Sequence, residues 1–140
     1  MTADRPDESR HERGRRTLSR IHSTTGEGVV AALAEIAPDF AKLLVDVPFG
    51  DVYSRPGLDL RSRQIATIAA LVALGHEREL KWHVRGGLNV GLTRDEIVEV
   101  IMQMAIYAGF PAAVNALFVV KELFEEIGAE AAEEALQDDA

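Results

Sequence analysis

Apolar residues recur at intervals of three and four along most of the chain, which is the spacing of one face of an α-helix. The most regular runs predict four principal helices, at residues 65–74, about 77–90, about 94–108 and 112–127. Shorter helices are expected at residues 10–21, 29–36 and 39–47. Because neither strand-like alternation nor an internal repeat stands out, the pattern predicts an all-α fold.

Turn-forming residues set the expected ends of the helices. Gly26 and Gly28 are expected to break the chain after the first helix, and Pro38 suits a first helical turn. Prolines and glycines predict an ordered loop over residues 48–58, and Asp59 can cap the helix that follows. Later boundaries are expected from two closing glycines and a capping box, at Gly75, Gly91 and the pair Thr93 and Glu96.

Two consecutive predicted helices, at residues 94–108 and 112–127, carry more apolar surface than one small core needs. The helix at residues 65–74 is apolar almost all round, which is typical of a helix buried on every side. The helices at residues 94–108 and 112–127 hold large apolar side chains outside their main stripes. Such a surplus indicates burial between subunits, so a homo-oligomer is expected.

The composition is that of one soluble globular domain, with 140 residues of which 47% are hydrophobic. The net charge of −8 belongs to the C-terminal end. Residues 1–121 hold fifteen basic and fifteen acidic residues, whereas residues 122–140 hold eight acidic residues and no basic one. The overall acidity therefore does not argue against an anionic substrate.

The chain has no cysteine, which excludes a disulfide scaffold, a thiolate nucleophile and a cysteine-ligated metal, and which fits a cytoplasmic location. Residues 1–16 lack the apolar segment of a signal peptide. The longest apolar stretch, residues 65–74, is about half a membrane span, so no membrane partner is expected.

Four arginines near the N-terminus recur at helical spacing: Arg10, Arg13, Arg16 and Arg20. This basic face could be a nucleic-acid arm, a solvated helix face, or a helix that lies against a neighbour's acidic tail. Since no aromatic residues are interleaved and the rest of the domain is neutral, no nucleic-acid partner is expected.

One predicted helix carries most of the candidate chemistry. His76, Glu79 and His83 fall along one of its faces, and the same side continues through Gly86 and Gly87. An adjoining apolar stripe places His83 at the edge of the core. Each glycine inside a helix costs about 1 kcal/mol relative to alanine, so a closely packed helix or a ligand needs this space.

Three interpretations of His83 are open at this point. It could transfer protons, or it could be a hydrogen-bonded core histidine in a simple i,i+4 pair with Glu79. With His76 the same residues could also bind zinc, although three ligands from two turns of one helix rarely converge without a fourth. The remaining histidines of the chain are His11 and His22.

The chain resembles the carboxymuconolactone decarboxylase family from about residue 25 to about residue 125. The similarity is carried by the segments RPGLDLRSR (55–63), ELKWH (79–83), GLTRDEIVEV (91–100) and YAGFPAA (107–113), with the apolar helix that ends at Gly75. These motifs are specific in combination and weak singly. Three parts are expected: a leader and basic helix (1–24), the family-like domain (25–128), and an acidic tail (129–140). Because the tail alternates alanine with mutually repelling carboxylates, it is expected to be a short helix that frays.

The family shares its helical fold with alkylhydroperoxidase D-like proteins, so the resemblance implies that fold here. Those proteins carry Cys-x-x-Cys with a histidine four residues on; the cysteines match His76 and Glu79, and the histidine matches His83. A glutamate that assists the cysteines matches Gln64. With neither thiols nor that acid, the thiol-dependent peroxidase branch is excluded.

The resemblance implies a cofactor-free decarboxylase that converts 4-carboxymuconolactone to 3-oxoadipate enol-lactone in the protocatechuate branch of aromatic catabolism. It also implies a ring-shaped homo-oligomer, a trimer or hexamer, with active sites near subunit contacts. No cofactor or metal is needed, because the lactone carbonyl can accept the electrons that decarboxylation releases. The alternatives are a same-fold enzyme for another enolisable acid or lactone, as in a natural-product pathway, and a non-catalytic oligomeric binding protein.

On this interpretation His83 transfers the proton and Glu79 orients its imidazole. Arg55, preferred over Arg85, binds the substrate's carboxylates. Further pocket residues are expected to be His76, Trp82 and Tyr107, with Tyr53 as an additional candidate. Both arginines have structural alternatives: Arg85 could be solvated, and Arg55 could pair with one of two aspartates, Asp51 or Asp59.

Overall fold

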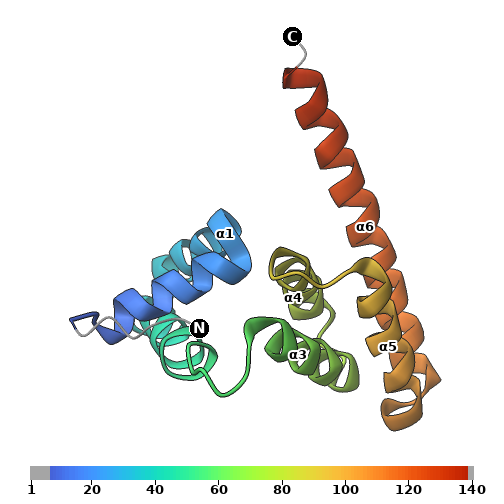
Figure 1. Ribbon diagram of the computed structural model, residues 1–140, viewed down its shortest axis with the longest axis horizontal. Helices are drawn as coiled ribbons and strands as arrows, with labels where there is room; N and C mark the ends of the chain where they lie inside the picture. Colours follow the sequence, from blue (N-terminus) through green and yellow to red (C-terminus); the bar gives the residue numbers. More distant parts are fainter. Residues whose placement is uncertain (1–6, 139–140) are drawn as a thin grey trace. The chain divides into compact units, whose positions relative to one another are not determined.

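The computed structural model describes residues 7–138, and every regular element in this range is a helix (Figure 1). In chain order these are α1 (Arg10–Ile36), α2 (Pro38–Leu44), the π-helix η1 (Val45–Tyr53), α3 (Leu60–Leu74), α4 (Glu77–Asn89), α5 (Arg94–Ala108) and α6 (Phe110–Asp138). The predicted all-α class is therefore confirmed. Over the described range no helix has both the length and the apolar character needed to cross a membrane.

The helices pack into two units. Unit 1 comprises the chain up to Gln64 together with Gly86–Leu92, and unit 2 comprises Ile65–Arg85 together with the chain from Thr93 onward. Unit 1 holds α1, α2 and η1, whereas unit 2 holds α5, α6 and most of α3 and α4. The candidate site residues are divided between the units accordingly.

In unit 1, α1 packs against α2 and η1. Helix α1 begins with a capping box between Ser9 and Glu12. The predicted break is present but its position is wrong: the backbone leaves helical geometry at Ser23, where φ is 52°, and the helix continues through Gly26 and Gly28. Gly26 instead provides space: a Cβ there would lie 2.9 Å from Leu18 Cδ1.

The predicted loop over residues 48–58 is partly wrong, because η1 extends to Tyr53. A proline inside an α-helix clashes with the carbonyl four residues earlier, and around Pro48 the chain adopts the wider π-helical turn. Gly50 is not a turn residue either. A Cβ at Gly50 would lie 2.7 Å from the Arg10 carbonyl oxygen, so the glycine permits close packing of η1 on α1.

Other predicted boundaries are confirmed. Pro38 stands in the first turn of α2. Asp59 caps α3 by accepting a hydrogen bond from the Ser62 N–H at 2.8 Å. The remaining predicted boundary residues are found at helix ends: Gly75 and Gly91, with φ of 74° and 101°, and the Thr93–Glu96 capping box, with hydrogen bonds of 2.9 and 3.1 Å.

In unit 2, α5 and α6 lie side by side and run in opposite directions (Figure 1). Their buried residues are Ile97 and Ile101 on α5 and Ala113, Ala116, Val120 and Leu123 on α6. The expectation that the tail frays after Gly128 is wrong as far as Asp138, because α6 continues to that residue. Its extension is held in part by an ion pair between Glu130 and Arg85 of α4.

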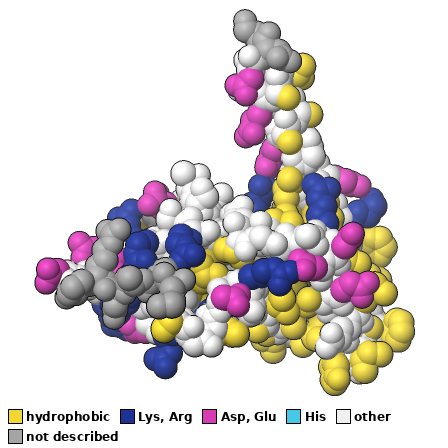
Figure 2. Space-filling view, in the orientation of Figure 1, with side chains coloured by type: hydrophobic (Ala, Val, Ile, Leu, Met, Phe, Trp, Pro, Cys, Tyr) yellow, Lys and Arg dark blue, Asp and Glu magenta, His cyan; other side chains and the backbone are white. Residues whose placement is uncertain are grey.

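The apolar surplus predicted from the sequence is exposed in this chain. Helix α3 is not buried on every side: Ile68 and Val72 are buried, but Leu74 is 67% exposed. Figure 2 shows hydrophobic side chains gathered where α5 and α6 join. The large exposed residues near this junction are Met102, Ile106, Tyr107, Phe110, Val114 and Phe118.

Candidate active site

His83 lies half-buried on α4, next to the ring of Trp82. The two ring centroids are 5.1 Å apart and the planes meet at 68°, an edge-to-face contact. Burial lowers the pKa of His83 to about 4, against the effect of the Glu79 carboxylate, which raises it. The imidazole is therefore neutral at neutral pH when no substrate is bound. Glu79 lies one turn earlier on α4 and is exposed.

The space at Gly86 is filled by another helix. A Cβ at Gly86 would lie 2.8 Å from His22 Cε1 and 2.9 Å from Ile21 Cγ2, both on α1. Asn89, at the end of α4, donates a hydrogen bond of 2.9 Å to the Ile21 carbonyl. Of the two explanations for this glycine, close helix packing is the one the structure supports.

Two further predicted residues lie on the surface. His76 is exposed in the connection between α3 and α4, where its carbonyl oxygen accepts a hydrogen bond of 2.9 Å from the Leu80 N–H. Tyr107, near the end of α5, is 77% exposed. Among residues 7–138, no three histidine, aspartate or glutamate side chains converge as metal ligands.

The guanidinium of Arg85 is engaged within unit 2. It makes a two-pronged contact with Glu130, with Nη1–Oε2 and Nη2–Oε1 distances of 2.8 and 3.0 Å. Such a bidentate pair satisfies the donors that a substrate carboxylate would use. Arg85 is accordingly the weaker of the two candidates for binding a substrate carboxylate.

Arg55 lies in unit 1, on the wall of a cavity of about 140 Å³. The cavity is lined by Thr17, Arg20, Tyr53, Ser54, Arg55, Pro56, Leu58, Asp59 and Leu60. The structural alternatives for Arg55 are not realised: Asp51 pairs with Arg10, and Asp59 caps α3. No ion pair joins the Arg55 guanidinium to another residue of the described range.

The loop that carries Arg55 is held by another arginine. Arg63 of α3 donates hydrogen bonds to the carbonyl oxygens of Leu58, at 3.0 Å, and Arg55, at 3.2 Å. On the other side, the Ser54 hydroxyl donates to the Gly50 carbonyl at 2.6 Å. The backbone around Arg55 is thereby fixed on both sides.

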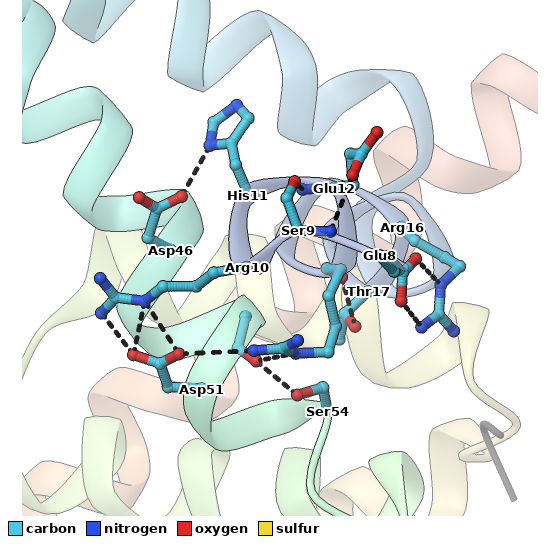
Figure 3. A network of polar contacts seen from close by, with 12 residues as sticks. Glu8, Ser9, Arg10, His11, Glu12, Arg16, Thr17, Asp46, Asp51 and Ser54 are labelled. Carbon is cyan, nitrogen blue, oxygen red and sulfur yellow. Dashed lines mark hydrogen bonds and ion pairs between the residues drawn. The ribbon is translucent and has the colours of Figure 1, made fainter. Parts of the chain in front are cut away.

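Most arginines on the basic face of α1 make polar contacts inside unit 1 (Figure 3). Arg10 pairs with Asp51, and Arg16 pairs with Glu8. Arg13 donates to the Gly50 carbonyl at 2.8 Å. The fourth arginine of the series, Arg20, lines the cavity that also holds Arg55. Spacing alone did not distinguish Arg20 from the others.

Another hollow, of about 320 Å³, lies between α5 and α6 in unit 2. Its lining is mainly apolar, and the guanidinium carbon of Arg94 stands 4.9 Å from the centroid of the Phe124 ring. None of the predicted site residues lines it.

Residues 38–122 match the model of the carboxymuconolactone decarboxylase family. The chain belongs to this family. A 4-carboxymuconolactone decarboxylase from Acinetobacter baylyi is 41% identical over 96 residues, which is 69% of this chain and 72% of the relative. The nitrosuccinic acid decarboxylase of Metarhizium robertsii is 31% identical over 61% of this chain and 60% of its own length. A protein of Paracoccus denitrificans described as uncharacterised is 33% identical over 68% and 72%.

Both relatives that are named for a reaction are decarboxylases, and the family member described here is a carboxy-lyase. His83, Glu79 and Arg55 all lie within the stretch that matches the carboxymuconolactone decarboxylase family, whereas Arg20 lies before it. The roles predicted from the family therefore concern His83, Glu79 and Arg55. They do not include Arg20.

Proposed function

We propose that this protein decarboxylates 4-carboxymuconolactone to 3-oxoadipate enol-lactone, without a cofactor, in the protocatechuate branch of aromatic catabolism. The likeness to the Acinetobacter enzyme of that name supports this substrate. The observation that carries the mechanism is the half-buried His83, whose pKa is lowered to about 4 within the family's matched stretch. Perturbed histidines of this kind are typical of acid–base sites.

The reaction needs an electron sink and one proton. As the bond from the ring to the carboxylate breaks, its electron pair enters the ring and moves through the double bond to the lactone carbonyl, while CO₂ leaves. The resulting dienolate then accepts one proton on the carbon next to that carbonyl and becomes the enol-lactone. Stabilising the dienolate and delivering the proton are therefore the tasks left to the protein.

His83 is assigned the proton transfer. The imidazole is neutral at neutral pH, so it must take up a proton from solvent before it can deliver one. A bound anionic lactone favours the imidazolium, since a nearby negative charge raises the pKa of a histidine. Glu79 acts in the same direction from one turn away and orients the ring.

The remaining predicted residues are assigned to substrate binding. Arg55 binds a carboxylate of the lactone, and Arg85 does so only if its pair with Glu130 opens. Trp82 supports the imidazole by its edge-to-face contact. The exposed residues His76 and Tyr107 contact substrate only where a second subunit covers them.

We further propose that the protein has the alkylhydroperoxidase D-like fold, assembles as a cytoplasmic trimer or hexamer, and partners neither nucleic acid nor membrane. The exposed apolar side chains where α5 and α6 join support assembly, because isolated chains rarely expose so many large apolar residues together (Figure 2). The pairing of Arg10 and Arg16 inside unit 1 also weakens the case for a nucleic-acid arm.

Incubating the purified protein with 4-carboxymuconolactone and following the enol-lactone by NMR tests the proposal. We expect turnover that Arg55→Ala reduces mainly through a KM raised about tenfold or more, because a charge-assisted hydrogen bond is lost. Absence of product from the folded wild-type protein would reject the substrate. An unchanged KM in Arg55→Ala would move carboxylate binding to another residue.

Nitrosuccinate is the second candidate substrate, favoured by the Metarhizium relative. A nitro group, like a lactone carbonyl, can accept the electron pair that decarboxylation releases. Assaying both acids in parallel separates the two functions by the ratio of their kcat/KM values. A ratio that favours nitrosuccinate would keep the family and change the substrate.

A further inference from the structure

The small cavity of unit 1 brings together two arginines from separate elements. Arg20 comes from α1 and Arg55 from the loop after η1, and both line the same space of about 140 Å³. Neither guanidinium makes an ion pair with another residue of the range 7–138. Pockets for drug-sized ligands typically measure about 300–1,000 Å³, so this one suits a small acid.

Arg20 differs in this respect from its neighbours on the same helix. Arg10 and Arg16 are paired with acidic residues, Arg13 donates to a carbonyl, and Arg15 contacts Glu27 at 3.0 Å. These contacts satisfy guanidinium groups within unit 1. Arg20 thus keeps its donors available at the cavity wall.

Three other polar side chains of the cavity already have hydrogen-bond partners, so the arginines are its charged donors. The Thr17 hydroxyl donates to the Arg13 carbonyl at 3.0 Å, and the Ser54 hydroxyl donates to the Gly50 carbonyl. Asp59 lines the cavity as an acid, but the Ser62 N–H and hydroxyl hold its carboxylate and lower its pKa. Two arginines against one aspartate leave the lining with a net positive charge.

We propose that this cavity binds a small dicarboxylate, with Arg55 on one carboxylate and Arg20 on the other. This inference deepens the proposed function, on which it rests, because both candidate substrates are acids with two carboxylates. It assigns a role to Arg20, which lies outside residues 38–122 and which the family match therefore does not assign. A bidentate guanidinium contact at each end selects two carboxylates at a set separation.

The backbone that carries each arginine is held in place. Arg20 belongs to a helix whose buried face packs through Leu18 and Ile21. The Arg55 loop is held by Arg63, which donates to two of its carbonyl oxygens. A ligand that bridges the two side chains would therefore not have to order a loop on binding.

Calorimetric titration tests the inference without turnover. The probe is the ring-saturated analogue of 4-carboxymuconolactone, which keeps both carboxylates but lacks the double bond through which electrons leave. Its two half-esters each carry one carboxylate. The wild-type protein is expected to bind the diacid about tenfold or more tighter than either half-ester.

Arg20→Gln should abolish the preference for the diacid over one half-ester, and Arg55→Gln should abolish it over the other. Arg15→Gln, which removes an equal charge from the same helix away from the cavity, is the matched control and should retain both preferences. Preferences unchanged in Arg20→Gln, or lost equally in Arg15→Gln, would overturn the inference. So would a wild-type protein that binds none of the probes.

These outcomes are separable from those of the proposed function. If the protein binds the diacid through both arginines but releases no CO₂ from 4-carboxymuconolactone, the proposed reaction is rejected and the binding site is retained. If Arg20→Gln turns the lactone over with the KM of the wild type, the reaction is retained and the binding role of Arg20 is rejected.

Discussion

Within residues 7–138, a histidine and a carboxylate form a pair in each unit, and the buried partner differs between the two pairs. In unit 1 the carboxylate is buried: Asp46 is 2% exposed, while its partner His11 is 40% exposed, with 2.6 Å between Nδ1 and Oδ1 (Figure 3). In unit 2 the histidine is half-buried and Glu79 is exposed.

The consequences for protonation differ accordingly. Hydrogen bonding from Lys42, supported by His11, lowers the pKa of Asp46, so that the carboxylate stays ionised. For His83, burial outweighs the attraction of Glu79, and its pKa falls to about 4. The first pair is a satisfied structural contact, whereas the second leaves a histidine in a state that a bound charge can change.

The largest expected difference between the pairs is in turnover. His83→Ala should lose about 100-fold or more in kcat with fold and oligomer retained, the usual scale for removing a general acid–base group. His11→Ala is the matched control and should turn over like the wild type. Comparable losses in the two variants would show that the histidines do not differ in role.

The next difference is in folding stability, to which the unit 1 pair is expected to contribute more than the unit 2 pair. Asp46→Asn should lower the free energy of unfolding by about 1–2 kcal/mol, because it weakens the contacts of a buried carboxylate with Lys42 and His11. Glu79→Gln, on an exposed position, should change it by less than about 0.5 kcal/mol. Urea unfolding of both variants measures this, and equal losses would remove the distinction between the pairs.

A smaller effect should appear in the pH dependence of stability. Because the pKa of His83 is lowered from 6.5 to about 4, the unfolded chain binds its proton first, and stability falls as pH is lowered between these values. The contribution of Asp46, whose pKa is lowered from 3.8, is present above that pH and lost below it.

His83→Gln should therefore flatten the upper part of the stability curve and Asp46→Asn the lower part. Unfolding free energies from urea titrations across the acidic range separate the two. An upper slope that persists in His83→Gln would mean that another group causes it.

The helix boundaries were predictable because their causes are local. Pro38, Asp59, Gly75 and the Thr93 capping box act through their own backbone neighbourhoods, and all were predicted from the sequence. Gly26 was misassigned as a break, and Gly50 as part of a loop, because each glycine serves close packing rather than a turn. Nothing in the local sequence distinguishes a glycine that ends a helix from one that admits a neighbour.

The candidate site divides in the same way. His83 and Arg55 were named from motifs and helical spacing, while Arg20 was read only as one of four similar arginines. What distinguishes Arg20 is that its neighbours are satisfied by partners such as Asp51, 41 residues away from Arg10. Such long-range pairing is a property of the packed chain, so spacing could not predict it.

The most direct test of His83 as the proton-transfer group is NMR titration of its imidazole, alone and with the ring-saturated diacid bound. We predict a pKa near 4 in the protein alone. Under the proposed function, in which one substrate meets both Arg55 and His83, we predict a higher value with the diacid, because a nearby negative charge favours the imidazolium. A titration near 6.5 that the diacid does not move would contradict it, since His83 would then be an ordinary solvated histidine away from any bound substrate.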